Sequence, residues 1–176
     1  MMRIILACLA IVLSVSSAHA APSEAELHAL HGLISDWQIH EAQTKLARWK
    51  ASDPDDSGVR FVNARLLYFQ GRYADSVAEI DRLIKDTGED APPAIKNFRD
   101  RVAGTRDALK GFDEVVSPDG RFLVRFKGVD RVVVPYALEV LAAADKKLAE
   151  DFAYRPPEQV VVEIYPEIKY LAAVSP

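Results

Sequence analysis

Few residues of this sequence have the types and spacing that a metal site needs. The segment 40–44 reads H-E-A-Q-T and begins like the zinc-protease motif H-E-x-x-H, in which two histidines four positions apart share one helix face. Thr44 stands where the second histidine would bind, so His40 is expected at the surface or in a contact between helices. His28 and His31 lie three positions apart, but no third ligand follows at a definable spacing. We therefore expect no metal and no cofactor in this chain.

Other candidate chemistry is equally incomplete. The segment 53–58, D-P-D-D-S-G, begins like a calcium-binding loop, but the glutamate expected eleven residues after Asp53 is Ala64. A turn between helical units explains this segment better. The sequence also lacks a glycine-rich phosphate loop and a nucleophile elbow, and its acidic residues are scattered rather than paired. No catalytic residue is therefore predicted.

The composition is that of an ordinary globular chain. The 176 residues carry 22 basic and 26 acidic side chains, a formal net charge of −4 at pH 7, and 49% of them are hydrophobic. These values argue against a disordered or collagen-like protein. The negative charge argues against a nucleic-acid partner held by bulk positive charge.

The first twenty residues have the pattern of a secretory signal peptide. A basic start ending at Arg3 precedes the apolar segment 4–15 and small residues that would allow cleavage between Ala20 and Ala21. A membrane anchor is the alternative, but the segment is shorter than the about 20 residues that a bilayer core needs. We therefore predict an exported protein, periplasmic or extracellular, with no transmembrane segment after cleavage. The only cysteine, Cys8, lies within the signal peptide, so the mature chain has no disulfide bond.

The chain repeats itself after 34 residues. Small and apolar residues recur at this interval, since Ala42, Leu46 and Trp49 are followed by Ser76, Ile80 and Leu83. Thirty-four residues is the period of the tetratricopeptide repeat, a pair of antiparallel helices, which the segment 57–90 resembles most. This resemblance implies a helical module over residues 21–111, with units at 23–56 and 57–90 and a capping helix at 92–110. The alternative is a pair of ordinary helical hairpins whose period is a coincidence.

Local signals mark where the helices begin and reverse. The segment 23–26, S-E-A-E, is a capping box and predicts a helix start directly after the cleavage site. Gly71 is expected in the turn of the second hairpin. The first unit has Trp37 in the region of that turn, so its hairpin is expected to be irregular.

Stacked helical hairpins present a concave face made by the first helix of each pair, which can bind a peptide or a protein partner. Five residues are placed on this face: Leu27, His31, Phe61, Arg65 and Tyr68. The alternative, equally open at this point, is that Phe61 and Tyr68 pack against the next helix.

The pattern changes from helical to mixed after Gly111. The turn sequence S-P-D-G at 117–120 precedes alternating Phe122, Val124 and Phe126, which predicts a β-hairpin with these three residues on one face.

A long helix and a further strand follow the predicted hairpin. The helix is expected from near Asp130 to Phe152, the strand at 159–165, and a short last helix from Pro166 through Lys169 and Leu171. The apolar stripe of the long helix consists of Val134, Ala137, Leu141, Ala144 and Leu148. The predicted fold class is α+β, mostly α: helical hairpins followed by a partial α+β domain.

Residues 112–176 resemble the N-terminal part of the peptidase MA-like domain. The resemblance rests on the hairpin, on the long helix with Y-A-L-E-V-L at 136–141, and on F-A-Y-R-P-P at 152–157 and V-V-V-E-I-Y-P at 160–166. That family is similar to zincin metallopeptidases, which implies that a full-length member binds zinc through an H-E-x-x-H helix further along the chain. No such motif occurs here, so the resemblance implies an N-terminal fragment of a longer product, or a relic that has lost its catalytic half, and in either case no catalytic residue in this chain. The alternative is a non-enzymatic scaffold whose repeats bind a peptide or a protein.

Overall fold

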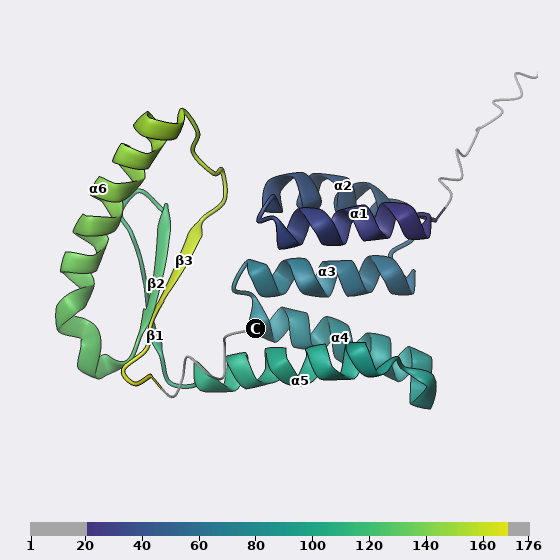
Figure 1. Ribbon diagram of the computed structural model, residues 1–176. Coiled ribbons are helices and arrows are strands. Elements are labelled where there is room, and N and C mark those ends of the chain that lie inside the picture. Colours follow the sequence, from purple (N-terminus) through teal and green to yellow (C-terminus); the bar gives the residue numbers. More distant parts are fainter. Residues whose placement is uncertain (1–20, 169–176) are drawn as a thin grey trace, which may run out of the picture.

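The computed structural model describes residues 21–168, which contain six α-helices and one three-stranded sheet (Figure 1). Five helices stack into a helical block, and the sixth lies on the sheet beside it. This architecture confirms the predicted class, α+β and mostly α. The predicted signal peptide, and the predicted last helix from Lys169 onward, lie outside the described residues. Residues 166–168 form a bend and a turn.

The helical block consists of two hairpins and one further helix. Its elements are α1 (Glu24–Ser35), α2 (Ile39–Ser52), α3 (Ser57–Phe69), α4 (Tyr73–Thr87), the 3-10 turn η1 (Gly88–Asp90) and α5 (Pro93–Ala108). One apolar cluster, including Leu30, Ile34 and Leu46, joins α1, α2 and α3. A second cluster, including Ile80 and Val102, joins α3, α4 and α5. Because α3 contributes to both clusters, the block has a continuous core.

The two hairpins reverse through the same turn. In the second hairpin Gly71 has φ +71°, and the N–H groups of Gly71 and Arg72 donate to Tyr68 and Leu67. Thirty-four residues earlier Trp37 has φ +59°, with the same pattern of two hydrogen bonds back to the last turn of α1. The expectation of an irregular first hairpin is therefore wrong. Because the helices on either side are packed into one core, the tryptophan adopts a backbone conformation that normally favours glycine.

Small side chains and caps fix the helices in the block. The capping box is present, since the Ser23 hydroxyl accepts from the Glu26 N–H and the Glu26 carboxylate accepts from the Ser23 N–H. The Ser23 N–H, followed by the Ser23 hydroxyl, donates to the Glu26 carboxylate and lowers the pKa of that carboxyl. Fully buried Ser76 brings α4 close to α3, because its hydroxyl donates to the Ala64 carbonyl at 2.7 Å.

The sheet has the strand order β1-β2-β3. Its strands are β1 (Asp113–Val116), β2 (Phe122–Phe126) and β3 (Val160–Ile164), with β1 antiparallel and β3 parallel to β2. The predicted hairpin and its turn are confirmed, since the Gly120 N–H donates to the Ser117 carbonyl at 2.8 Å. Phe122, Val124 and Phe126 are all buried, as their alternation predicted.

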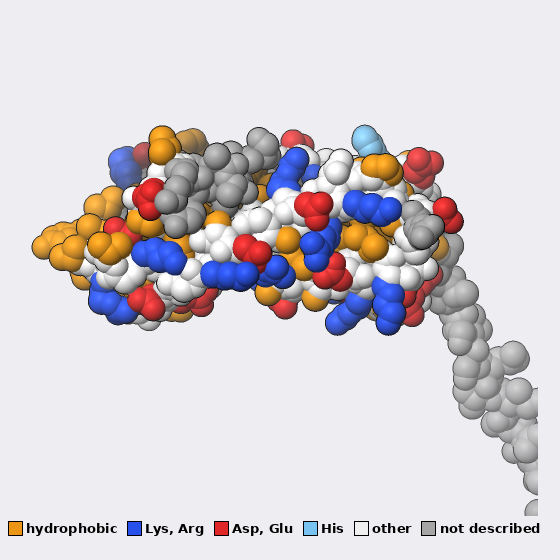
Figure 2. Space-filling view, turned by 90° about the horizontal axis from the view of Figure 1, so that it is seen from below, with side chains coloured by type: hydrophobic (Ala, Val, Ile, Leu, Met, Phe, Trp, Pro, Cys, Tyr) orange, Lys and Arg blue, Asp and Glu red, His pale blue; other side chains and the backbone are white. Residues whose placement is uncertain are grey.

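Helix α6 (Val134–Phe152) follows the 3-10 helix η2 (Gly128–Val133) and covers one face of the sheet. Val134 and Leu141 pack on the sheet as predicted, but Ala144 is exposed and Leu148 is 53% exposed, so that part of the predicted stripe is wrong. A helix of 19 residues is about 28 Å long, whereas a strand of five residues covers about 17 Å, so α6 extends beyond the sheet. Hydrophobic side chains accordingly gather at the end of the molecule formed by α6 (Figure 2).

One arginine joins the sheet to the helical block. The Arg125 side chain donates to the Gly71 carbonyl at 2.7 Å and pairs with Glu163 at 3.1 Å and Glu114 at 2.8 Å. Its guanidinium also lies 5.7 Å from the centre of the Tyr73 ring, and burial together with the Glu163 carboxylate raises the pKa of Tyr73. The turn between α3 and α4 is therefore an attachment point of the sheet.

Candidate functional site

Four of the five predicted binding residues lie in one row across the helical block. His31 of α1 is 5.6 Å from the ring of Phe61 on α3, and that ring is 5.7 Å from Phe98 on α5. Tyr68 completes the row, 5.7 Å from Phe98. All these side chains are half-buried, as is Arg65, which lies among them on α3. We call this surface, formed by His31, Phe61, Arg65, Tyr68 and Phe98, the aromatic face.

The packing alternative for Phe61 and Tyr68 is confirmed, whereas their role in binding a partner stays a prediction. Phe61 and Tyr68 do pack edge-on against the next helix, through Phe98, and each still keeps part of its ring at the surface. Phe98 was not among the predicted site residues. Its place in the apolar stripe of the 92–110 helix was the signal that could have identified it.

Leu27 lies apart from the row. Its side chain packs against the first apolar cluster and over Gly58, where an added Cβ atom would force a Leu27 methyl group to shift. Leu27 therefore holds α1 against α3 at the start of both helices.

Arg65 is the one charged group on the aromatic face. Its guanidinium Nη1 lies 2.5 Å from His31 Nδ1, and its Nη2 donates to the Ser35 hydroxyl at 3.3 Å. Burial lowers the pKa of Arg65, which nevertheless stays protonated near neutral pH. Among residues 21–168, no carboxylate forms an ion pair with it. The face therefore carries a half-buried cation whose neighbours are neutral.

His31 is one of those neutral neighbours. Burial, followed by the charges of Arg65 and His28, lowers the pKa of His31 to about 4. The imidazole is therefore uncharged at pH 7, and its Nδ1 accepts a hydrogen bond from Arg65. The two residues are 34 positions apart, so they occupy equivalent places in successive units.

A guanidinium in this setting suits an anionic ligand group. Arginine has five N–H donors in a planar fork that matches a carboxylate, and such a bond strengthens as water is excluded. The aromatic rings beside Arg65 offer apolar contact area to the rest of a ligand. The face can thus hold a segment with an acidic and an apolar group side by side.

The other residues considered for chemistry do not converge. His28 is exposed, and His40 Nδ1 lies 3.0 Å from Glu158 Oε1 at the surface between α2 and the segment before β3. In the described part of the chain, no three His, Cys, Asp or Glu side chains are grouped to hold a metal ion. Within the same residues, no helix has the length and apolar character to cross a membrane.

Comparison of the chain with models of known families, with curated proteins and with solved structures finds no match in any of the three.

Proposed function

We propose that this chain is an exported protein whose helical repeats bind a peptide or a protein segment on the aromatic face, with a carboxylate of the ligand on Arg65. The observation that carries the proposal is the half-buried Arg65 guanidinium without a carboxylate partner among the described residues. Burying a charge costs free energy unless it is paired, so a ligand carboxylate would supply what the site lacks.

The rings add a second requirement for the ligand. Phe61, Tyr68 and Phe98 meet edge to face, and a partly exposed aromatic row favours an apolar side chain next to the carboxylate. The ligand would therefore be a segment with an acidic residue, or a free C-terminus, beside an apolar residue.

The test starts from random heptapeptides selected on the mature chain, once with free and once with amidated C-termini. We expect enriched peptides to contain Asp, Glu or a free C-terminus, the two libraries separating these sources. Arg65→Glu should weaken their binding at least about tenfold, because it replaces a charge-assisted bond with repulsion. Arg48→Glu, an exposed position on α2, is the matched control and should leave binding unchanged. Equal binding by both variants would count against the proposal.

The second candidate is an N-terminal portion of a peptidase MA-like metallopeptidase. The observation that favours it is the order of a hairpin, a long helix and a parallel strand in residues 113–164. Sequencing the native transcript beyond codon 176, with the intact mass of the exported protein, tests this candidate. An H-E-x-x-H motif within about one further domain length supports it, and a stop codon at position 177 contradicts it.

A further inference from the structure

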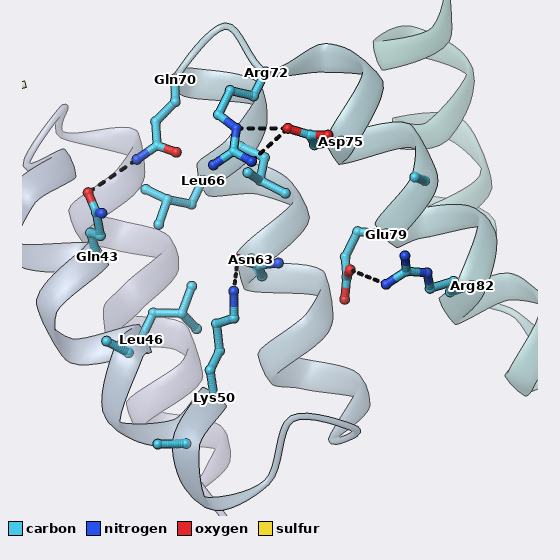
Figure 3. Close-up of a pocket in the computed structure, with 14 residues that line it drawn as sticks. Gln43, Leu46, Lys50, Asn63, Leu66, Gln70, Arg72, Asp75, Glu79 and Arg82 are labelled. Atoms are coloured by element: carbon cyan, nitrogen blue, oxygen red, sulfur yellow. Dashed lines mark hydrogen bonds and ion pairs between the residues drawn. The ribbon is translucent and has the colours of Figure 1, made fainter. Parts of the chain in front are cut away.

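A polar groove of about 590 Å³ crosses the helical block between α2 and α4 (Figure 3). Helix α3 forms the floor of the groove. The walls are shallow because they carry small side chains, Ala47 and Ala51 on α2 and Ala78 on α4. At 100° per residue, the floor residues Asn63, Leu66 and Gln70 lie on the side of α3 opposite Phe61, Arg65 and Tyr68. The groove is therefore separate from the aromatic face.

The middle of the groove is defined by Asn63, which is only 9% exposed. Lys50 Nζ donates to Asn63 Oδ1 at 3.1 Å, and because an ammonium group can only donate, this contact fixes the orientation of the amide. The Asn63 NH₂ group then points away from Lys50, toward the side where Glu79 lies (Figure 3). Within residues 21–168, no hydrogen bond uses this NH₂ group.

Glu79 offers an acceptor opposite that donor. Its Oε1 accepts from Arg60 at 3.3 Å, whereas its Oε2 has only a longer contact of 3.6 Å with Arg82. The Glu79 side chain is 16% exposed, and Glu79 lines the groove. The floor and the α4 wall thus present a free amide donor and a carboxylate with remaining acceptor capacity.

A second donor and acceptor lie at one end of the groove. Gln70 Nε2 donates to Gln43 Oε1 at 3.2 Å, a bond that links α3 to α2 (Figure 3). This bond leaves the Gln43 NH₂ group and the Gln70 carbonyl oxygen without another hydrogen bond in the described residues. The end of the groove therefore repeats the pairing found at its middle.

A donor that lies opposite an acceptor is the complement of one peptide group, whose C=O accepts and whose N–H, pointing the other way, donates. Asn63 and Gln70 are seven residues apart on α3, about 10.5 Å along the helix axis. A chain in the extended polyproline II conformation covers this distance in about three residues, which is one turn of that conformation, so its peptide groups point the same way at both ends. From this match we propose that the groove binds an extended polypeptide segment of about four residues through its backbone peptide groups.

The low alanine walls fit this mode of recognition. They leave room for the side chains of a bound segment without selecting among them, so binding should depend little on the sequence of the segment. Lys50 keeps N–H donors beyond the one it uses for Asn63, and it can donate to a further carbonyl group of the segment. The site differs in this respect from the aromatic face, where the proposed ligand needs a carboxylate.

The test is a titration of the full mature chain with acetylated and amidated tetra-alanine, followed by ¹⁵N–¹H NMR. This probe has no carboxylate, so it tests the groove independently of Arg65. We expect saturable shifts of the side-chain NH₂ signals of Asn63 and Gln43. The same peptide with N-methylated amides should produce no such shifts, because it lacks the N–H donors that Glu79 and Gln70 would accept.

Variants complete the test. Asn63→Leu should weaken binding about fivefold, as expected for the loss of one hydrogen bond. Gln43→Ala, at an exposed position that cannot disturb the core, should weaken it by a similar factor. Asn97→Leu, an exposed amide on α5, is the control and should bind as the parent does. Equal shifts with the two peptides, or unchanged binding by Gln43→Ala, would overturn the proposal.

Discussion

The helical block and the sheet region bury their apolar residues to different extents. In the helical block, Ile34 and Ile80 are fully buried, and both apolar clusters are enclosed by three helices each. In the sheet region, Val124, Phe126 and Val134 form the only buried cluster among the described residues, whereas Val129 and Phe152 are more than 70% exposed. Burial thus depends on how many layers surround a residue, not on its type alone.

This contrast has an energetic consequence. Three helices contribute to each apolar cluster of the block, but the sheet has α6 on one face and the α3–α4 turn near the other. We therefore expect the free energy of unfolding to come mainly from the helical block. The sheet should depend more strongly on the polar contacts that attach it.

The largest expected effect is a cavity in the helical block. Ile80→Ala removes a fully buried side chain and should lower the free energy of unfolding by about 2–5 kcal/mol, measured by urea denaturation. Val140→Ala, at a position on α6 that is 66% exposed, should change it by less than about 0.5 kcal/mol. Similar losses in the two variants would mean that α6 is covered in solution and that the contrast between the regions is false.

A smaller effect is expected at the attachment of the sheet. Arg125→Ala leaves Glu163, whose side chain is 13% exposed, without its cation, and should cost about 2–3 kcal/mol. Hydrogen exchange should show that the amides of β2 and β3 lose more protection than those of α4. Lys147→Ala removes an exposed pair on α6 and should cost at most about 0.5 kcal/mol. Equal loss of protection in α4 and the sheet would show that the regions unfold as one unit.

The smallest effect is a pH dependence confined to the helical block. The pKa of His31 is about 4 in the folded protein, below the ordinary value of 6.5, so the folded state binds fewer protons than the unfolded state between these values. Its contribution to stability is full above pH 6.5 and is lost as the pH falls toward 4. We expect a lower urea midpoint at pH 5 than at pH 7, and His31→Gln should reduce this difference. A difference of the same size in His31→Gln would contradict the assignment.

The sequence predicts the elements better than their burial. The capping box at Ser23 and the alternation around Val124 are local patterns, and both are present in the structure. The exposed Leu148 could not be foreseen, because its burial depends on the length of the sheet beneath α6, which no residue of the helix encodes.

The two proposed sites differ in how far the sequence predicts them. A period of 34 residues places Arg65 beside His31, so the contact on the aromatic face follows from the repeat itself. The groove depends instead on which way the Asn63 amide points, and that is decided by Lys50 on another helix. Such an orientation is a property of the packed molecule and leaves no pattern along the chain.

The two turns with positive φ, at Trp37 and Gly71, contact different parts of the molecule. A left-handed tryptophan costs about 1–2 kcal/mol that a glycine would avoid, but the Trp37 ring lies edge-on 5.1 Å from Phe69 on the following hairpin, a contact that contributes about 0.5–1.5 kcal/mol. The first turn therefore contacts the next hairpin through its side chain. At Gly71 a side chain would come within 3.2 Å of Arg125 and Val161. Gly71 has no side chain, and this leaves the space in which Arg125 and Val161 of the sheet approach the turn between α3 and α4.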